Sequence, residues 1–248
     1  AGDGNMMQVC EMGADAHTAT ASLAFGAPAE LVVRENKLVG HETSPIRIKE
    51  LRTKYCPEVF DYNPPGGMSL RQAGKKSNHA LDYDMGSNTF ALNNEVLIAE
   101  ARHICEAYHN AYPNIRYTFH KYVKDQLNTT RTLTNLLGRK RTFYAQYADA
   151  MFKDGYAFIP QSTLVDVVNR AMTLIYNDPD PIFKHMEILM QVHDSILFQY
   201  NLEKGTIGDL AQAIIKAGEY LNPELSWQGR TFHIRNEVEI GYNWGAPG

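Results

Sequence analysis

The chain has 248 residues, 44% of them hydrophobic, and a formal net charge of −4 at pH 7. This length suffices for one large domain or two small ones, and the charged fraction of 21% argues against disorder. No apolar run reaches the roughly 18–20 residues of a membrane span. The stretch after Ala1 contains acidic residues and no apolar core run, so we expect no secretory signal there. The three cysteines have no paired spacing that indicates disulfides or zinc, so we expect a soluble protein of the reducing cytoplasm.

The N-terminal stretch predicts a strand that ends at a carboxylate. Apolar residues alternate loosely from Met6 onward and stop at two small residues, so that the strand would carry Asp15 at its tip. Residues 19–26 have the composition of a short helix, whereas the polar stretch that follows, up to Tyr62, has no clear periodicity.

Helices are expected through the middle of the chain. The Pro- and Gly-rich residues 63–67 form a break, after which Ser69 can cap a helix that runs toward Gly86. Apolar residues at helical spacing continue this pattern over residues 92–127.

Turns, a helix and strands are expected in the C-terminal part. Turn signals occur at Gly138 and at residues 154–155, and a helix follows over residues 161–176. Two apolar strands within residues 187–201 meet at His193 and Asp194.

A final helix, over residues 207–220, and a final strand, over residues 232–240, complete the pattern. Strands at both ends of the chain therefore enclose a helical block. This order predicts the α+β class, with an antiparallel sheet interrupted by a helical subdomain.

Two carboxylates at the tips of predicted strands suit a metal site. Asp194 occupies a tight turn between apolar strands, and Asp15 ends the first strand. Either residue alone is a common turn former. As a pair, the carboxylates can hold two Mg²⁺ ions about 3.5–4 Å apart, one to activate a primer 3′-hydroxyl and one to stabilise the leaving pyrophosphate.

The helix after Ser69 carries four functional side chains on one face. Arg71, Lys75, His79 and Tyr83 recur every four residues, which places them in line along a helix. A triphosphate needs several converging cations, which Arg71 and Lys75 can supply, and the two rings offer flat surfaces for sugar and base. A basic strip between Lys121 and Arg141, taken alone, is better explained by a solvated helix face.

The order of these features resembles motifs A, B and C of the family A DNA polymerases: a strand ending in Asp, an Arg-x₃-Lys-x₇-Tyr helix, and a hairpin bearing His-Asp. Three further segments look like the family's Gly-Arg-Arg loop, its Gln-bearing helix and its closing strand: residues 134–141, 160–172 and 239–244. The resemblance implies a right-hand polymerase fold, with the thumb outside this chain. Its palm would comprise residues 1–25 and 153–248, around mainly helical fingers at residues 26–152.

The resemblance also implies roles for the matching residues around the nucleotide. Asp15 and Asp194 would bind the metal ions, with the Ala16 carbonyl as a further ligand. Arg71 and Lys75 would hold the triphosphate, and Lys75 would protonate the leaving group. The rest of the nucleotide pocket would consist of His79, Tyr83 and Thr20.

A second set of matching residues would contact the nucleic acid. Gln161 would reach the minor-groove edge of the new base pair, and His193 would lie near the primer terminus. Arg139 and Arg141 would contact the nucleic-acid backbone.

The chain departs from the family pattern at several positions. Thr20 replaces a Glu that crowds the ribose 2′-hydroxyl, so we expect better tolerance of ribonucleotides than in most relatives. Ser195 replaces a third carboxylate after His-Asp. His79 stands where the family has Phe or Tyr, and Asp84 where Gly is common.

The function expected from this resemblance is template-dependent DNA synthesis from a primer in DNA replication, with primer-template DNA, deoxynucleoside triphosphates and two Mg²⁺ ions. The missing thumb and further palm would lie upstream on the same precursor or on a separate polypeptide. His79 and Ser195 are similar to phage-encoded members, which would place the protein in a host cytoplasm. Two alternatives are a phage-type single-subunit RNA polymerase, which shares His-Asp-Ser, and an inactive polymerase fold that serves as a DNA-binding scaffold.

Overall fold

The computed structural model describes residues 3–40 and 42–243, which form two compact units. Unit 1 takes in the chain up to residue 131 together with residues 145–156, and unit 2 takes in residues 132–144 and the chain from residue 157 onward. Helices and short antiparallel sheets make up the described residues, which confirms the α+β class. No helix in this described part of the chain is long and apolar enough to cross a membrane.

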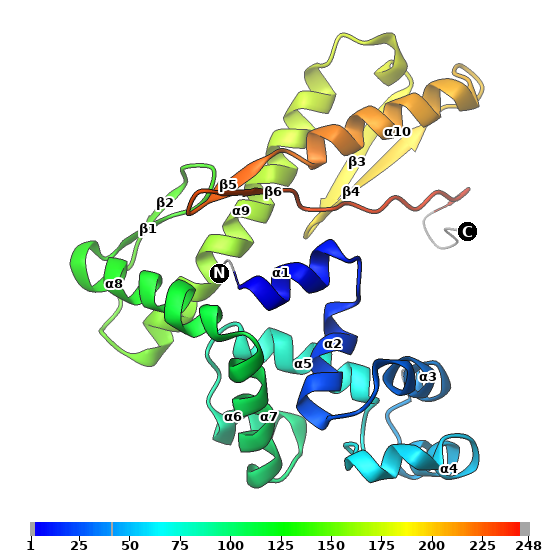
Figure 1. Cartoon of the computed structure of the whole chain (residues 1–248). Helices are drawn as coiled ribbons and strands as arrows, with labels where there is room; N and C mark the ends of the chain where they lie inside the picture. The colour runs from blue at the N-terminus through cyan, green and yellow to red at the C-terminus, as the bar shows by residue number, and fades with distance from the viewer. Residues whose placement is uncertain (1–2, 41, 244–248) are drawn as a thin grey trace. The chain divides into compact units, whose positions relative to one another are not determined.

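Unit 1 is built mainly from helices, which Figure 1 shows in blue to green. In chain order they are α1 (Gly4–Glu11), α2 (Ala16–Phe25), α3 (Ala29–Val39), α4 (Pro45–Tyr55), the 3₁₀ helix η1 (Pro57–Tyr62), α5 (Leu70–Leu81), α6 (Ser87–Asn94), α7 (Ile98–Ala111), the π-helix η2 (Ile115–His120), α8 (Lys121–Thr130), and the start of α9 (Asp149–Asn177). The predicted helices after Ser69 and over residues 92–127 are confirmed.

The predicted N-terminal strand is wrong, because this stretch forms α1. A strand satisfies its backbone polar groups only beside another strand, whereas a helix satisfies them locally. Asp3 supports the helix, since its Oδ1 accepts hydrogen bonds from the backbone N–H groups of Asn5 and Met6 at 3.1 and 3.2 Å. Asp15 is therefore not at a strand tip but at the N-cap of α2.

The helices α2 and α5 pack backbone against backbone (Figure 1). Gly74, on α5, faces α2 so closely that a Cβ atom there would overlap the carbonyl oxygen of His17 and lie 2.9 Å from the backbone nitrogen of Ala21. The absence of a side chain at this position thus allows the two helices to approach.

A buried ion pair ties α3 and α4 to the start of α5. Arg52 and Glu35 have exposed side-chain fractions of 2% and 0%, and the Arg52 Nη2 lies 2.6 Å from the Glu35 Oε1. The guanidinium also donates to the carbonyl oxygens of Pro65 and Met68, and the Glu35 Oε2 accepts from the backbone N–H of Leu70 at 3.0 Å. These contacts satisfy both buried charges, which is the condition under which such a pair is tolerated.

Unit 2 combines the rest of α9 with short antiparallel hairpins. Its remaining elements are β1 (Thr132–Thr134), β2 (Lys140–Thr142), the 3₁₀ helix η3 (Pro181–Phe183), β3 (Met186–Val192), β4 (Ser195–Tyr200), α10 (Ile207–Leu221), β5 (Leu225–Trp227) and β6 (Arg230–Phe232). Among the described residues the strands pair as three separate two-stranded sheets. The predicted hairpin at His193 and Asp194 and the predicted helix over residues 207–220 are confirmed.

Two sequence predictions for the C-terminal part are wrong. Residues 154–155 are not a turn but lie inside α9, where the burial of Met151 and Tyr156 outweighs the cost of about 1 kcal/mol for a helical glycine. The strand predicted over residues 232–240 is paired only at its first residue, because residues 233–240 have no neighbouring strand within the described structure. Trp244, at the end of the predicted closing segment, lies outside the described residues.

Arg52→Leu is expected to lower the free energy of unfolding by about 3–5 kcal/mol, because it leaves the Glu35 carboxylate buried without a counterion. Urea denaturation followed by circular dichroism measures this loss. Arg47→Leu is the matched control, since Arg47 lies on the same helix and its exposed pair with Glu50 is worth about 0–1 kcal/mol. Equal losses in the two variants would contradict the role given to the buried pair.

Gly74→Ala is expected to destabilise the protein by about 1–3 kcal/mol or more, because the new methyl group overlaps backbone atoms that cannot rotate away. The control is Gly208→Ala, which is also inside a helix and whose Cβ atom would meet only the Thr206 hydroxyl, at an ordinary contact distance of 3.5 Å. Thermal melting of both variants makes the comparison. A Gly74→Ala protein as stable as the control would show that α2 and α5 separate without cost.

Candidate functional site

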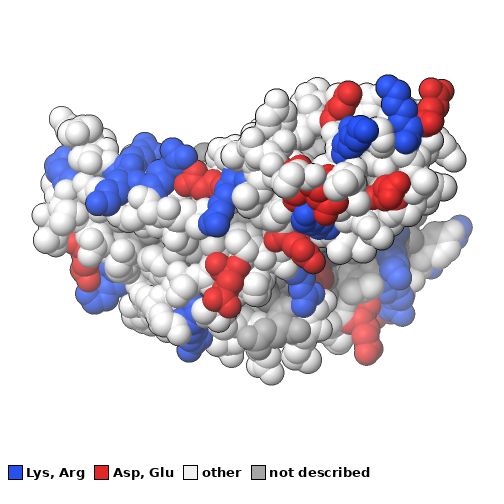
Figure 2. Space-filling model, turned by 90° about the horizontal axis from the view of Figure 1, so that it is seen from above, with Lys and Arg blue, Asp and Glu red and all other residues white. Residues whose placement is uncertain are grey.

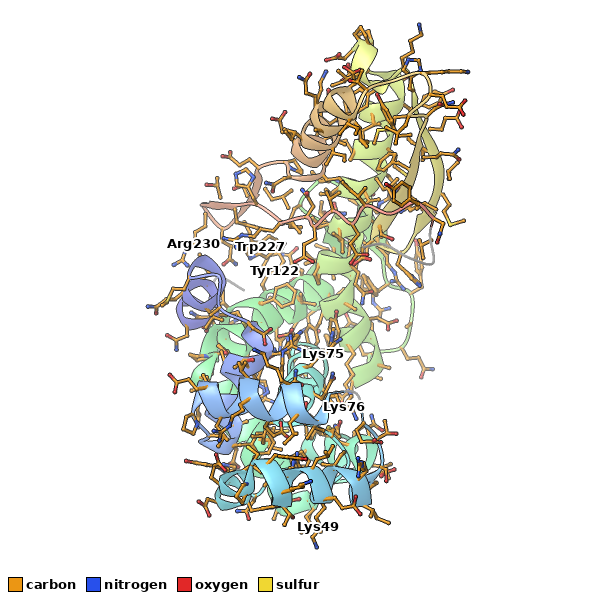
Figure 3. All side chains as sticks on the ribbon, turned by 90° about the vertical axis from the view of Figure 1, so that its right-hand side faces the viewer. Lys49, Lys75, Lys76, Tyr122, Trp227 and Arg230 are labelled. Atoms are coloured by element: carbon orange, nitrogen blue, oxygen red, sulfur yellow. The ribbon has the colours of Figure 1, made fainter. Side chains whose placement is uncertain are left out.

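The crossing of α2 and α5 brings together side chains predicted for the nucleotide site. Asp15 precedes the first turn of α2, and Arg71, Lys75 and His79 follow at steps of four along α5. Lys75 and its neighbour Lys76 extend from α5 (Figure 3), and both are exposed. Residues that were predicted from two distant segments thus meet at one surface of unit 1.

Asp15 and Arg71 form a two-pronged ion pair. The Arg71 Nε donates to the Asp15 Oδ2 at 2.6 Å, and the Arg71 Nη2 donates to Oδ1 at 2.9 Å. Thr18 adds its backbone N–H and its hydroxyl to Oδ2, at 3.0 and 2.6 Å. Partial burial by itself raises the pKa of Asp15, but the hydrogen bonds from Arg71 and Thr18 outweigh it and lower that pKa to about 2. The carboxylate is therefore ionised at neutral pH.

His17 and Asn78 belong to the same surface, although neither was predicted from the sequence. The His17 Nδ1 lies 3.0 Å from the Asn78 Nδ2, and the rings of His17 and His79 are 6.2 Å apart. Burial and the nearby cations, opposed by Asp15, lower the pKa of His17, so that its imidazole is neutral and accepts from the Asn78 amide. Once Asp15 is recognised as a helix cap, His17 can be placed on the first turn, two residues further on.

Asn78 also fixes two other predicted site residues. The Thr20 hydroxyl, which is buried, donates to the Asn78 Oδ1 at 2.8 Å and lies 3.4 Å from the hydroxyl of Tyr112. The Asn78 amide lies 3.4 Å from the carbonyl oxygen of Ala16. Thr20 is thus held inside the contact between α2 and α5.

The His-Asp turn of unit 2 is a tight two-residue connection between β3 and β4. Val192 pairs with Ser195 across the turn, and the Ser195 hydroxyl donates to the Val192 carbonyl oxygen at 2.8 Å. His193 has φ = +53°, a conformation that is strained for a residue other than glycine and that recurs at functional sites. Asp194 is exposed at the tip, where its carboxylate is accessible.

The other predicted nucleic-acid contacts lie on α9 and on the hairpin β1–β2. Gln161 is exposed on α9. Arg139 is bound to Asp166 of α9, with its Nε 2.9 Å from both carboxylate oxygens, and Asn135 donates to the same carboxylate at 2.7 Å. Arg139 therefore docks the hairpin on α9, while the Arg141 guanidinium lies over the ring of Phe143.

The predicted site residues are divided between the two units. Unit 1 holds Asp15, Ala16, Thr20, Arg71, Lys75, His79 and Tyr83, and unit 2 holds Arg139, Arg141, Gln161, His193 and Asp194. The structure brings Asp15 and Arg71 together, whereas the joint metal site of Asp15 and Asp194 stays a prediction. Although the chain is acidic overall, Lys and Arg side chains gather toward the left of the face shown in Figure 2.

Comparison with known proteins gives consistent matches. The sequence model of DNA polymerase family A matches residues 58–246, which is more than half of the chain. DNA polymerase I of Helicobacter pylori (strain ATCC 700392 / 26695) is 28% identical over 153 residues, which cover 58% of this chain and 16% of that protein. The thermostable DNA polymerase I of Thermus aquaticus is 23% identical over 252 residues, which cover 98% of this chain and 24% of that protein.

A solved structure has the same fold. The POL domain of Pol1 from M. smegmatis, in complex with DNA primer-template and dNTP, superimposes with a TM-score of 0.65 at 21% sequence identity. The likeness covers 88% of this chain and 33% of that one. The chain spans a quarter or less of the curated relatives named above, at 16% and 24% of their lengths. With a family match that extends over residues 58–246, the chain belongs to DNA polymerase family A.

Proposed function

We propose that this chain supplies the nucleotide-binding and catalytic part of a DNA-directed DNA polymerase, which transfers a nucleotide to the 3′-hydroxyl of a primer. The observation that carries the proposal is the meeting of Asp15 with the cationic face of α5, in a chain that belongs to this family. Family membership favours this function over a phage-type RNA polymerase. An ionised carboxylate paired with Arg71 also favours it over a scaffold without activity.

In the proposed reaction, α5 binds the triphosphate. Arg71 exchanges the Asp15 carboxylate for phosphate oxygens, which suit the same two-pronged donor geometry. Lys75, exposed one turn further along, adds a second positive charge and gives a proton to the leaving pyrophosphate. His79 and Tyr83 line the pocket for the sugar and base.

The donor set suits a divalent cation. The carboxylates of Asp15 and Asp194 and the carbonyl oxygen of Ala16 are hard oxygen ligands, of the kind that Mg²⁺ prefers. Asp15 is ionised at neutral pH and needs no deprotonation to bind a cation. We assign two Mg²⁺ ions to these ligands; when bound, they stabilise the charge on the attacking and leaving oxygens.

The proposed partners are primer-template DNA and deoxynucleoside triphosphates, because both are named for the M. smegmatis domain that shares this fold. Gln161, His193, Arg139 and Arg141 would contact the DNA. A thumb and further palm would come from upstream residues of the same precursor or from a separate polypeptide. Residues 1–25 and 153–248 remain assigned to the palm and residues 26–152 to the fingers. The proposed role in replication implies a cytoplasmic location, in a host cell if the source is viral.

Asp194→Asn is expected to reduce primer extension by more than about 100-fold. Loss of a metal ligand lowers activity more than loss of a residue that only orients a ligand, which lowers it about 10–100-fold. Extension of a labelled primer on a DNA template with Mg²⁺ and deoxynucleotides measures the effect. Asp125→Asn, which removes an exposed carboxylate paired with Lys121, is the matched control.

Three outcomes of this experiment are informative. Extension by Asp194→Asn at the wild-type rate would contradict the metal role. Extension that appears only after an upstream polypeptide is added would identify a split enzyme. Absence of extension by the wild type, both with and without the upstream polypeptide, would favour the function of an inactive DNA-binding scaffold.

Thr20→Gln is expected to sharpen sugar selection, because the longer side chain is too large for the buried position of Thr20 between α2 and α5 and would extend toward the proposed ribose. We expect the ratio of kcat/KM for dATP to that for ATP to rise by roughly 10-fold or more, within the range of steric discrimination in a pocket. Single-nucleotide incorporation measures both constants, and Thr20→Ser, which keeps the hydroxyl bonded to Asn78, is the control. Near-absolute rejection of ATP by the wild type would contradict the expectation.

A further inference from the structure

The helix α5 ends in a left-handed turn that has an aspartate where glycine is favoured. The backbone N–H of Met85 donates to the Ala80 carbonyl at 3.0 Å, and the N–H of Asp84 donates to the Leu81 carbonyl at 3.1 Å. This pair of bonds is the Schellman arrangement, in which the residue at the Asp84 position has positive φ and is usually glycine. Asp84 adopts this conformation with φ = +55°. Tyr83, the predicted nucleotide contact, is the residue immediately before it.

An ion pair holds Asp84 in this conformation. The Nε and Nη2 of Arg116 donate to the Asp84 Oδ1 at 3.0 and 2.8 Å, and the Lys124 ammonium lies 3.7 Å from Oδ2. The side chain of Asp84 is 22% exposed and that of Arg116 is 46% exposed, so the pair is partly accessible to solvent. Burial by itself raises the pKa of Asp84, but Arg116 outweighs it and lowers that pKa, so that the carboxylate is charged.

The residue on the other side of Tyr83 is also fixed. The Asp82 Oδ1 accepts from the hydroxyl of Tyr108 at 2.5 Å, and the Asp82 carbonyl oxygen lies 2.6 Å from the Nε2 of His120. Arg116 and His120 both belong to η2, a π-helix, and the ring of His120 stacks on that of Tyr156 at 4.0 Å. Contacts from α7 and η2 therefore hold the residues on both sides of Tyr83.

We propose that Asp84 is a positioning residue, and that its ion pair with Arg116 determines the position of the Tyr83 ring when a nucleotide binds. This inference rests on the proposed function, because it gives the Tyr83 ring a nucleotide to contact. Glycine at position 84 would form the same left-handed turn without strain. Aspartate adds a carboxylate that Arg116 of η2 binds. The direction of the chain at the end of α5 therefore depends on the position of η2.

The test uses single-nucleotide incorporation by the full-length protein that contains this chain. Asp84→Asn removes the charge but keeps the size and tolerates positive φ, and Arg116→Gln removes the partner. We expect each variant to raise the KM for the nucleotide about 3–10-fold with kcat within about 2-fold, as for a change in nucleotide binding. Lys121→Gln, which breaks an exposed ion pair on the neighbouring helix α8, is the control and should leave both constants unchanged.

Three further variants separate positioning from a role in stability. The double variant Asp84→Asn/Arg116→Gln should have a KM no higher than either single variant, because both remove one shared interaction. In a Tyr83→Ala background, Asp84→Asn should have no further effect on KM. Asp84→Gly, which relieves the strained φ, should melt no lower than the wild type and yet raise the KM.

The outcomes distinguish this inference from the proposed function. If the wild type incorporates nucleotides and Asp84→Asn leaves the KM unchanged, the positioning role is wrong and the proposed function stands. If Asp84→Asn raises the KM equally with and without Tyr83, the effect does not pass through that ring and the positioning role is again wrong. If the wild type incorporates no nucleotide under any condition, both are wrong.

Discussion

Contact between the backbones of α2 and α5 at Gly74 determines the geometry of the candidate site in unit 1. Helices that pack through their side chains have axes about 8–10 Å apart, and a Cβ atom at position 74 would push α2 and α5 away from their present contact. At the glycine contact, Asn78 reaches both His17 and Thr20, and Arg71 reaches Asp15 with two nitrogens. The polar contacts that define this surface therefore depend on one position that has no side chain.

The helix α5 is held at its start and at its end by two different ion pairs. At the start, Glu35 and Arg52 are buried, and their remaining hydrogen-bonding groups bind the loop that leads into the helix. At the end, the partners Asp84 and Arg116 are partly exposed, and they fix a strained turn. A buried pair is costly to break, whereas a partly exposed one can open and close. The start of α5 is thus the more rigid of its two ends.

The elements that could be predicted correctly from the sequence depend on local signals. The helix after Ser69 and the hairpin at Asp194 depend on caps, turns and periodicity within a few residues. The strands expected at the two ends depend on partners far along the chain, and the N-terminal stretch, which pairs with no strand among the described residues, forms α1. The pairing of Asp15 with Arg71 joins residues 56 positions apart, and no local pattern reveals it. The order of the motifs therefore indicated the family, while the contacts between them required the structure.

When no ligand is bound, Asp15 and Arg71 are each other's binding partner. A cation that binds Asp15 has to displace the guanidinium, and an anion that binds Arg71 has to displace the carboxylate. Whichever ligand arrives first breaks the pair, and the second then binds without that cost. Cation and anion are consequently coupled by positive heterotropic linkage, and each raises the affinity of the other by the same factor. A metal-bound nucleotide, which would bring both charges at once, would gain most from this coupling.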